Sequence, residues 1–172
     1  MNPSLVGSEM CIRDSPCKAC EYCLRAQLNH CENMRFYGSA MPFPHIHGAF
    51  QQSIVADVSQ CAPADGLQAA EAAMAEPLSV SLHAVKQAGN LVGKTVLITG
   101  CGPIGIMTIL AARRAGATKI IATDLSEFTL EKATLAGADV IHNVATNPES
   151  LSSLNVGKGQ VDVHFECSGS ET

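Results

Sequence analysis

The chain has 172 residues, of which 47% are hydrophobic and 16% charged, and its net charge is −5. The length suits one domain, or one domain and part of another. This composition excludes an acidic disordered tail, which combines dense charge with few apolar residues. The negative charge argues against nucleic acid as a main partner, because phosphate binding favours a basic surface. No apolar run reaches the length of a membrane span, so we expect neither nucleic acid nor a membrane as a partner.

The first fifteen residues, MNPSLVGSEMCIRDS, show neither helical nor strand periodicity. The run Leu5–Ser15 looks like a translated transposase adapter from DNA library preparation, so we expect residues 1–15 to be non-native. A natural loose terminus is the alternative. The chain closes on a strand-like run, VDVHFECSGSET, and we expect it to be a fragment at both ends. Cys11 is accordingly excluded from any metal site.

Residues 16–66 are rich in Cys, Pro, Gly and His and favour loops and short strands, such as the alternating stretch Ala49–Asp57. The alanine-rich segment Leu67–Ala88 favours a helix that breaks at Pro77. These two stretches suggest one domain over residues 16–88 and a second over residues 89–172.

Residues 93–170 alternate between strand-like and helix-like patterns. The pattern predicts strands over 94–99, 118–124, 138–144 and 161–167, helices over 104–116 and 126–137, and a weaker helix over 149–154. Gly116 and Gly137 stand where the helices should end, and Ser126 is a candidate N-cap. Such alternation, with β-branched strands, predicts an α/β fold with a parallel sheet covered on both faces.

Four cysteines cluster within fifteen residues, with two, two and seven residues between them: Cys17, Cys20, Cys23 and Cys31. Four thiolates at this spacing can surround one ion tetrahedrally, and zinc suits them in a closed structural site. An iron–sulfur cluster is the alternative, although the fourth cysteine is followed by Glu32 and not by proline. A zinc-ribbon nucleic-acid module is a second alternative, weakly supported because residues 17–35 carry little net charge.

A glycine-rich loop, Gly100-Cys101-Gly102-Pro103-Ile104-Gly105, follows one predicted strand and opens a predicted helix. This context is the one in which G-x-G-x-x-G binds a dinucleotide. Gly100 permits the tight turn, Gly102 lets a pyrophosphate approach the backbone, and Gly105 lets helix and strand pack closely. Pro103 presets the helix start, and the free N–H groups of that helix, from Ile104 onward, face the phosphates.

Asp124 ends the next strand, nineteen residues after Gly105. An acidic residue at this place hydrogen-bonds the ribose hydroxyls of NAD and repels the 2′-phosphate of NADP. Taken alone, Asp124 suits a turn or a cap equally well; together with the loop it predicts NAD binding.

Glu76 precedes Pro77 in an otherwise apolar run, so we expect it at a helix entrance. An acid in such surroundings needs a partner, although a surface carboxylate favoured by the helix dipole is an equal alternative. The isolated cysteines Cys61, Cys101 and Cys167 are interpreted as small buried hydrophobes.

Together these motifs resemble the zinc-dependent medium-chain dehydrogenases of the alcohol and sorbitol dehydrogenase type, over about residues 16–170. The resemblance implies a GroES-like, β-rich catalytic domain with a structural zinc lobe, followed by a Rossmann-type doubly wound sheet, each of them partial. It implies that the four clustered cysteines bind structural zinc and that the glycine loop and Asp124 bind NAD. It also implies that Glu76 ligates the catalytic zinc or holds its water, and that Cys167-Ser168-Gly169 passes beside the nicotinamide.

Residues Met34–Met41, with Pro44-His45 and GCGPIG, most resemble the L-idonate 5-dehydrogenase subfamily. That resemblance implies a cytoplasmic homo-oligomer that oxidises a secondary alcohol of a sugar acid to 5-keto-gluconate, with zinc lowering the pKa of the alcohol and NAD accepting the hydride. The family's first catalytic cysteine and its Gly-His-Glu zinc segment are absent from this sequence, so we expect the chain itself to be inactive. Alternatives are a sorbitol, threonine or alcohol dehydrogenase, or a non-enzymatic zinc-stabilised nucleotide-binding module.

Overall fold

The computed structural model describes residues 15–39, 43–53, 55, 61 and 63–169. The chain divides into two compact units, with the boundary between Ala72 and Ala73. This boundary precedes the expected one at residue 88 because the helix over residues 75–88 packs on the second unit. Residues 1–14, most of the suspected adapter, lie outside the described part.

The described residues of the first unit form α2 (Glu21–Leu24) and the 3-10 helix η1 (Leu28–His30), and α3 (Ala69–Ala73) lies at the boundary with the second unit. One isolated antiparallel bridge joins Ser15 to Arg35. The short strands expected over residues 16–66 do not form in the described part of this unit. A strand needs a paired neighbour for its backbone groups, and residues 49–53 and 55 of the alternating stretch are unpaired; the rest of that stretch lies outside the described residues.

The alanine-rich segment forms α3 (Ala69–Ala73) and α4 (Ala75–Ala88). The interruption lies at Met74 and not, as expected, at Pro77. Pro77 is the third residue of α4, and the first turn of a helix tolerates proline because its N–H groups have no acceptor within the helix. Glu76 therefore lies at the helix entrance, as predicted.

The second unit contains a four-stranded sheet in which every pairing is parallel, with the order β3-β2-β1-β4. The strands are β1 (Thr95–Thr99), β2 (Lys119–Asp124), β3 (Val140–Asn143) and β4 (Val163–Glu166). All four confirm the predicted strands. The sequence order reverses between β1 and β4, and a doubly wound sheet has its binding crevice at such a point, beyond the carboxyl ends of the strands.

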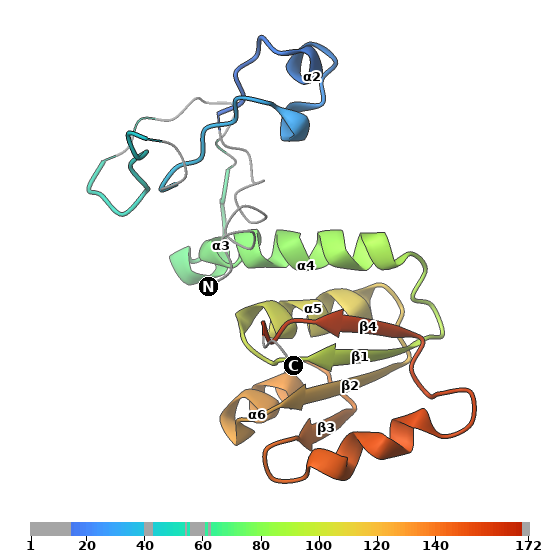
Figure 1. Ribbon diagram of the computed structural model, residues 1–172. Helices are drawn as coiled ribbons and strands as arrows, with labels where there is room; N and C mark the ends of the chain where they lie inside the picture. Colours follow the sequence, from blue (N-terminus) through green and yellow to red (C-terminus); the bar gives the residue numbers. More distant parts are fainter. Residues whose placement is uncertain (1–14, 40–42, 54, 56–60, 62, 170–172) are drawn as a thin grey trace. The chain divides into compact units, whose positions relative to one another are not determined.

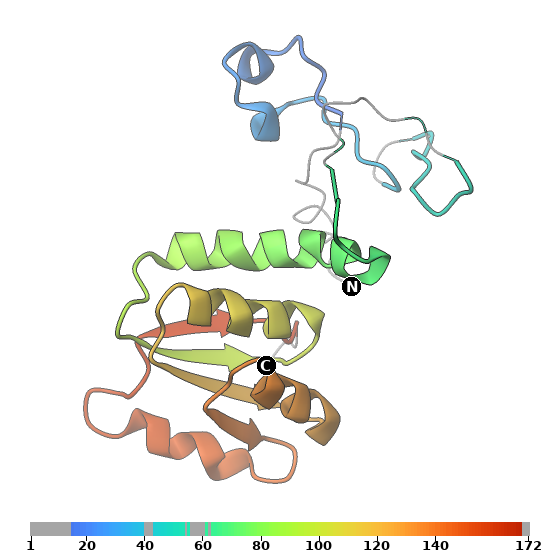
Figure 2. The ribbon, with the colours of Figure 1, turned by 180° about the vertical axis from the view of Figure 1, so that it is seen from behind.

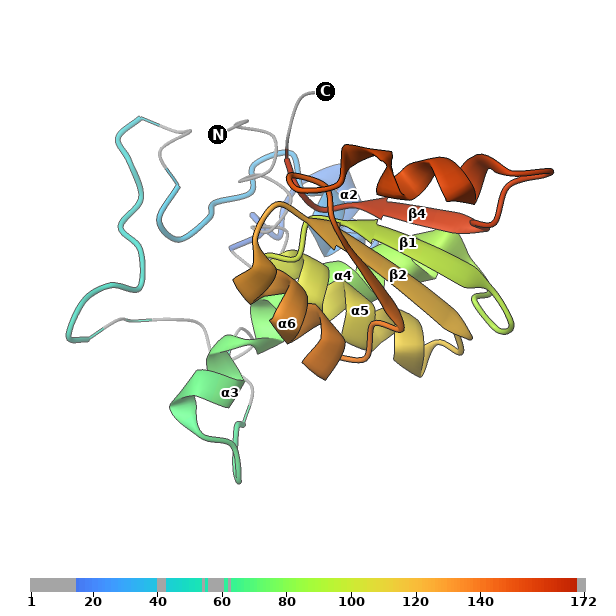
Figure 3. The ribbon, with the colours of Figure 1, turned by 90° about the horizontal axis from the view of Figure 1, so that it is seen from below.

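Helices cover both faces of this sheet, as predicted. The helices α4, α5 (Pro103–Arg114) and α6 (Glu127–Leu135) lie on one face, and η3 (Pro148–Asn155) lies on the other (Figure 3). Figures 1 and 2 show α4 running alongside α5 in opposite views. Gly116 and Gly137, with φ of 96° and 106°, follow the last helical turns as predicted. Ser126 occupies the N-cap of α6, but its side chain makes no capping bond.

The core of the second unit lies between the sheet and α4, α5 and α6. Val96, Ile98 and Ile120 of the strands and Ile109 and Ala112 of α5 are fully buried there. These side chains occupy the apolar positions that the strand and helix periodicities predict. Among the described residues, no helix is both long and apolar enough to cross a membrane.

Candidate cofactor loop and metal centre

The glycine loop joins the carboxyl end of β1 to α5, and two of its glycines allow backbone segments to touch. Gly100 has φ of 84°, and a Cβ there would lie 2.5 Å from the Cα of Ser168. A Cβ on Gly105 would lie 1.9 Å from the carbonyl oxygen of Gly100. The roles predicted for these residues, a tight turn and close packing of helix on strand, are therefore required by the backbone.

Gly102 is the open glycine of the loop. It is the N-cap of α5, with φ of −68°, and no atom lies within 4 Å of a Cβ built on it. Pro103 takes the first helical position as predicted, and Ile106 N–H donates the first helical bond to the Gly102 carbonyl (2.9 Å). The N–H groups of Ile104 and Gly105 precede that bond, so they have no acceptor inside the helix. Such amides suit an anion, because the helix dipole adds to them.

Asp124, at the end of β2, holds this loop in shape. Its Oδ2 accepts the N–H of Cys101 at 2.6 Å, and its Oδ1 accepts the N–H of Ser126 at 3.0 Å. Burial raises the pKa of Asp124, but these backbone N–H donors and the Thr129 hydroxyl outweigh it and hold the pKa below its usual value. The carboxylate is thus charged at neutral pH and lies at the crevice. The alternative role of Asp124 in a turn is thus present in the structure, and its ribose role stays a prediction.

A turn after β4 lies directly against the glycine loop. The carboxylate of Glu166 accepts N–H bonds from Ser168 (2.6 Å) and Gly169 (3.3 Å), and the hydroxyls of Ser168 and Thr99 also donate to it. Burial raises the pKa of Glu166, but the Ser168 and Thr99 hydroxyls and the backbone donors hold it below the usual value. Glu166 and Thr99 were not among the residues predicted from the sequence. The available signal was an acidic residue at the end of a strand, two positions before a Ser-Gly turn.

Two of the isolated cysteines lie beside this loop. Cys101 is 1% exposed, and burial, then the charges of Asp124 and Cys167, raise the pKa of its thiol to about 12. Burial also raises the pKa of Cys167, which is half-buried against the core. Both thiols stay protonated, as expected of packing residues. The expectation is wrong for Cys61, which is exposed, because no sheet or helix among the described residues of the loop-rich first unit covers it.

Glu76 is half-buried at the start of α4, and its Oε1 atom is buried. The Ser79 hydroxyl donates to the main-chain carbonyl of Glu76 at 2.7 Å and not to its carboxylate. Among the described residues, Glu76 belongs to no group of three or more potential metal ligands. These residues therefore do not form a complete catalytic zinc site, and Glu76 remains a single predicted ligand.

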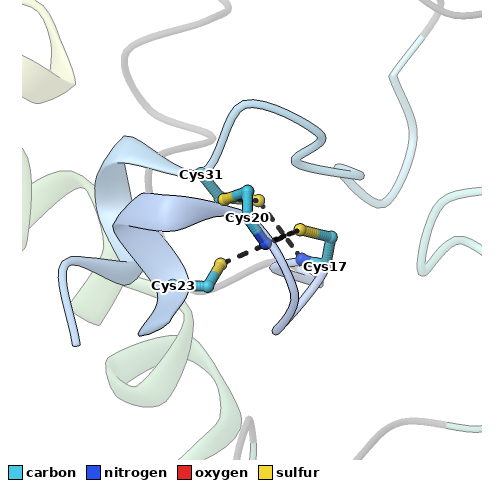
Figure 4. A group of neighbouring side chains, drawn as sticks. All are labelled: Cys17, Cys20, Cys23 and Cys31. Atoms are coloured by element: carbon cyan, nitrogen blue, oxygen red, sulfur yellow. Dashed lines mark hydrogen bonds between the residues drawn. The ribbon is translucent and has the colours of Figure 1, made fainter. Parts of the chain in front are cut away.

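The four clustered cysteines converge in the first unit. Their Sγ atoms all lie within 4.8 Å of one another, and Figure 4 shows the side chains turned toward a common centre. The Sγ atoms of Cys17 and Cys23 are 4.0 Å apart, as are those of Cys20 and Cys31. Ligands at a Zn–S distance of about 2.3 Å in a tetrahedron are separated by about 3.8 Å, so the arrangement fits zinc.

Backbone N–H groups near these sulfurs favour the thiolate form at Cys17 and Cys20, which is the form that binds a cation. The N–H of Cys17 donates to Cys31 Sγ at 3.2 Å, and the N–H of Cys20 donates to Cys17 Sγ at 3.3 Å. Backbone donors at Ala19 and Cys20 lower the pKa of Cys17 to about 6. Backbone donors at Cys23 and Glu32 also lower the pKa of Cys20.

Cys23 differs, because burial raises the pKa of its thiol to about 12 when no metal is bound. The cluster therefore favours thiolate at some sulfurs and thiol at others. A metal ion resolves this difference, since it binds thiolate and releases the remaining protons.

Comparison with known proteins agrees with these motifs. Residues 103–172 match the family described as zinc-binding dehydrogenase. The chain is 42% identical to an L-idonate 5-dehydrogenase (NAD(P)(+)) of Escherichia coli K12 over 166 residues, which is 95% of this chain and 48% of that protein. It is 38% identical to an L-arabinitol 4-dehydrogenase of Aspergillus oryzae over 156 residues, 90% of this chain and 39% of that protein.

The fold agrees as well. The crystal structure of L-idonate 5-dehydrogenase from E. coli K-12 superposes with a TM-score of 0.81 at 41% identity, and the match covers 90% of this chain and 44% of that one. The chain thus spans less than half the length of these relatives. The zinc-type cysteine cluster, the glycine loop at the crevice of a parallel sheet and these similarities lead to one conclusion, that residues 103–172 belong to the zinc-binding dehydrogenase family and that most of the chain is similar to its members.

Proposed function

We propose that the chain is the zinc-lobe and cofactor-binding part of an NAD-dependent dehydrogenase that oxidises a polyol or a sugar acid. The observation that carries the proposal is the glycine loop. It is closed by backbone contacts at Gly100 and Gly105 and open at Gly102, at the carboxyl end of β1. The open position at Gly102 lies at the first turn of α5, where a pyrophosphate can approach the backbone.

The described residues have distinct roles in this proposal. The N–H groups of Ile104 and Gly105 bind the pyrophosphate, and the Asp124 carboxylate accepts the ribose hydroxyls. Because Asp124 is charged at neutral pH, it repels the 2′-phosphate of NADP, so NAD is the preferred cofactor. Cys167 and Ser168, on the turn that contacts Gly100, lie beside the nicotinamide.

The cysteine cluster binds a structural zinc ion and takes no part in the reaction. Four thiolates complete a tetrahedral shell and leave no open position for substrate. A reducing cytoplasm, which we propose as the location, keeps such thiols available as ligands.

For the substrate we propose L-idonate, oxidised to 5-keto-gluconate. The support is the higher identity to an L-idonate 5-dehydrogenase (42%) than to an L-arabinitol 4-dehydrogenase (38%). A catalytic zinc held in part by Glu76 would lower the pKa of the substrate alcohol, and NAD would accept the hydride. Glu76 is the residue that we assign to that metal. Because the described residues supply only this ligand, we propose that the chain by itself does not turn over substrate.

The experiment is a fluorescence titration of the 172-residue chain with NADH and with NADPH. We expect saturable NADH binding and weaker NADPH binding, and we expect Asp124→Asn to reduce the difference between them. Asp139→Asn is the matched control, because Asp139 also accepts a backbone N–H at 2.6 Å but lies at the opposite end of β2. Absence of NADH binding, or equal preference in the wild-type chain, would contradict the proposed cofactor. A panel of L-idonate and polyols, tested on the longer parent protein, decides the substrate.

A further inference from the structure

Two hydroxyl side chains are buried where α4 packs on α5. Ser81 is 0% exposed and Thr108 is 1% exposed. Their neighbours on these two helix faces are apolar, including Val85, Ile109 and Ala112. A hydroxyl in such an interface loses its hydration, so it is retained only if protein groups bond to it.

These two hydroxyls bond to each other and to main-chain carbonyls of both helices. Thr108 Oγ1 lies 2.8 Å from the Ile104 carbonyl and 3.1 Å from Ser81 Oγ. Ser81 Oγ lies 3.2 Å from the Pro77 carbonyl and 3.3 Å from the Ile104 carbonyl. Each hydroxyl has one hydrogen to donate and lone pairs to accept, so the pair can connect α4 to α5 in either direction.

The pair touches three segments of the proposed site. Pro77 follows Glu76 directly, at the entrance of α4. Ile104 belongs to the first turn of α5, whose amides face the proposed pyrophosphate. Thr108 Oγ1 also lies 3.9 Å from the Sγ of Cys167, on the turn assigned to the nicotinamide. Of the four polar residues that are buried in the described part of the chain, Ser81 and Thr108 are the two that are less than 2% exposed.

From these contacts we infer that Ser81 and Thr108 are positioning residues, which hold the first turn of α5 and the Cys167 turn in the geometry that binds the dinucleotide. The inference rests on the proposed cofactor site for its functional consequence. Its structural consequence, a fixed Cys167 turn, is independent of any cofactor.

Stability alone does not explain the pair. Replacing both partners of a buried hydrogen bond by apolar groups of the same shape is nearly neutral for folding. Alanine at position 81 and valine at position 108 preserve the shape of the interface and remove both hydroxyls. The double variant Ser81→Ala/Thr108→Val therefore separates positioning from stability.

The test measures NADH affinity, the free energy of unfolding in urea and the rate at which iodoacetamide alkylates Cys167, mapped by mass spectrometry. For the double variant we expect NADH affinity to fall about fivefold, the loss that matches one hydrogen bond. Cys167 alkylation should accelerate by a similar factor, because its turn is less restrained. The single variant Thr108→Ser keeps both hydroxyls. Its NADH affinity and its rate of Cys167 alkylation should therefore equal those of the wild-type chain.

The control is Thr134→Val, which removes a threonine hydroxyl that bonds a carbonyl four residues earlier, but on α6 (3.1 Å to Leu130). It should change neither measurement. Unchanged affinity and unchanged Cys167 alkylation in the double variant would overturn the inference, as would changes that merely parallel a loss of unfolding free energy. If the wild-type chain binds no NADH, the proposed function fails, and the alkylation rate alone still decides whether the pair fixes the Cys167 turn.

Discussion

Alanine at two glycines of the same loop should separate folding from cofactor binding. In Gly105→Ala the new Cβ would lie 1.9 Å from the Gly100 carbonyl oxygen, about 1.5 Å inside ordinary contact, and 2.9 Å from the Gly100 carbonyl carbon. Both obstacles are backbone, so α5 must move away from β1. In Gly102→Ala the new Cβ meets no atom within 4 Å, and φ of −68° is ordinary for alanine.

The two variants have different expected magnitudes. Overpacking costs about 1–3 kcal/mol, and a clash with backbone belongs at the upper end, while alanine in a helix recovers roughly 1 kcal/mol. We therefore expect Gly105→Ala to lower the free energy of unfolding by about 2 kcal/mol. Gly102→Ala changes only the residue at the N-cap, which costs less than about 1 kcal/mol. Its methyl group, however, stands where the pyrophosphate must approach, so NADH affinity should fall about tenfold or more.

Urea unfolding followed by circular dichroism gives the first quantity, and NADH fluorescence titration gives the second. The decisive result is the contrast between the variants. A Gly105→Ala chain as stable as the wild type would show that the helix and strand are not in contact as described. A Gly102→Ala chain that binds NADH normally would show that the pyrophosphate does not use this loop.

Three further predictions concern the metal lobe and two carboxylates. Cys31→Ser should reduce bound zinc, measured by elemental analysis, to well below one ion per chain. The control Cys61→Ser removes an exposed cysteine outside the cluster and should leave one zinc ion per chain. Equal zinc content in both variants would contradict the proposed zinc site. Because the native pKa of Glu166 lies below its ordinary value of 4.5, its contribution to stability is present above that pH and is lost as the pH falls through the native pKa. Urea unfolding of Glu166→Gln should lack this part of the acid dependence, and an unaltered pH profile would refute it. Asp139→Ala should lower the unfolding free energy by about 1–3 kcal/mol, because it removes the acceptor for Ile120 N–H and for Arg113 (2.6 Å each); an unchanged urea midpoint would refute it.

The sequence predicted the second unit well because its signals are local. Each strand of the sheet follows from a short run rich in apolar and β-branched residues, and the glycines at 116 and 137 end helices at their own positions. The glycine loop was predictable for the same reason, since Gly100, Gly102 and Gly105 act within one turn of chain. The four cysteines needed only their spacing.

The first unit and the isolated cysteines were predicted less well. An alternating pattern at residues 49–57 favours a strand but does not supply the neighbouring strand that pairs with it. The exposure of Cys61 depends likewise on whether another layer covers it, and no property of cysteine itself decides that. The helix break at Met74, three residues before Pro77, shows that proline only forbids certain positions in a helix and does not choose where the helix begins.

By itself, the sequence determined which residues can do chemistry: four thiols at ligand spacing, a glycine-rich loop between a strand and a helix, and an acid at the end of a strand. Only the tertiary structure decided how these residues are held. The bond from Cys101 to Asp124, the clamp of Glu166 on Thr99 and the Ser81–Thr108 pair join residues separated by 23 to 67 positions. Parallel pairing brings the carboxyl ends of β1, β2 and β4 to the same end of the sheet, and α4 packs on α5. These two features of the tertiary structure create the contacts, and no local pattern in the sequence encodes them.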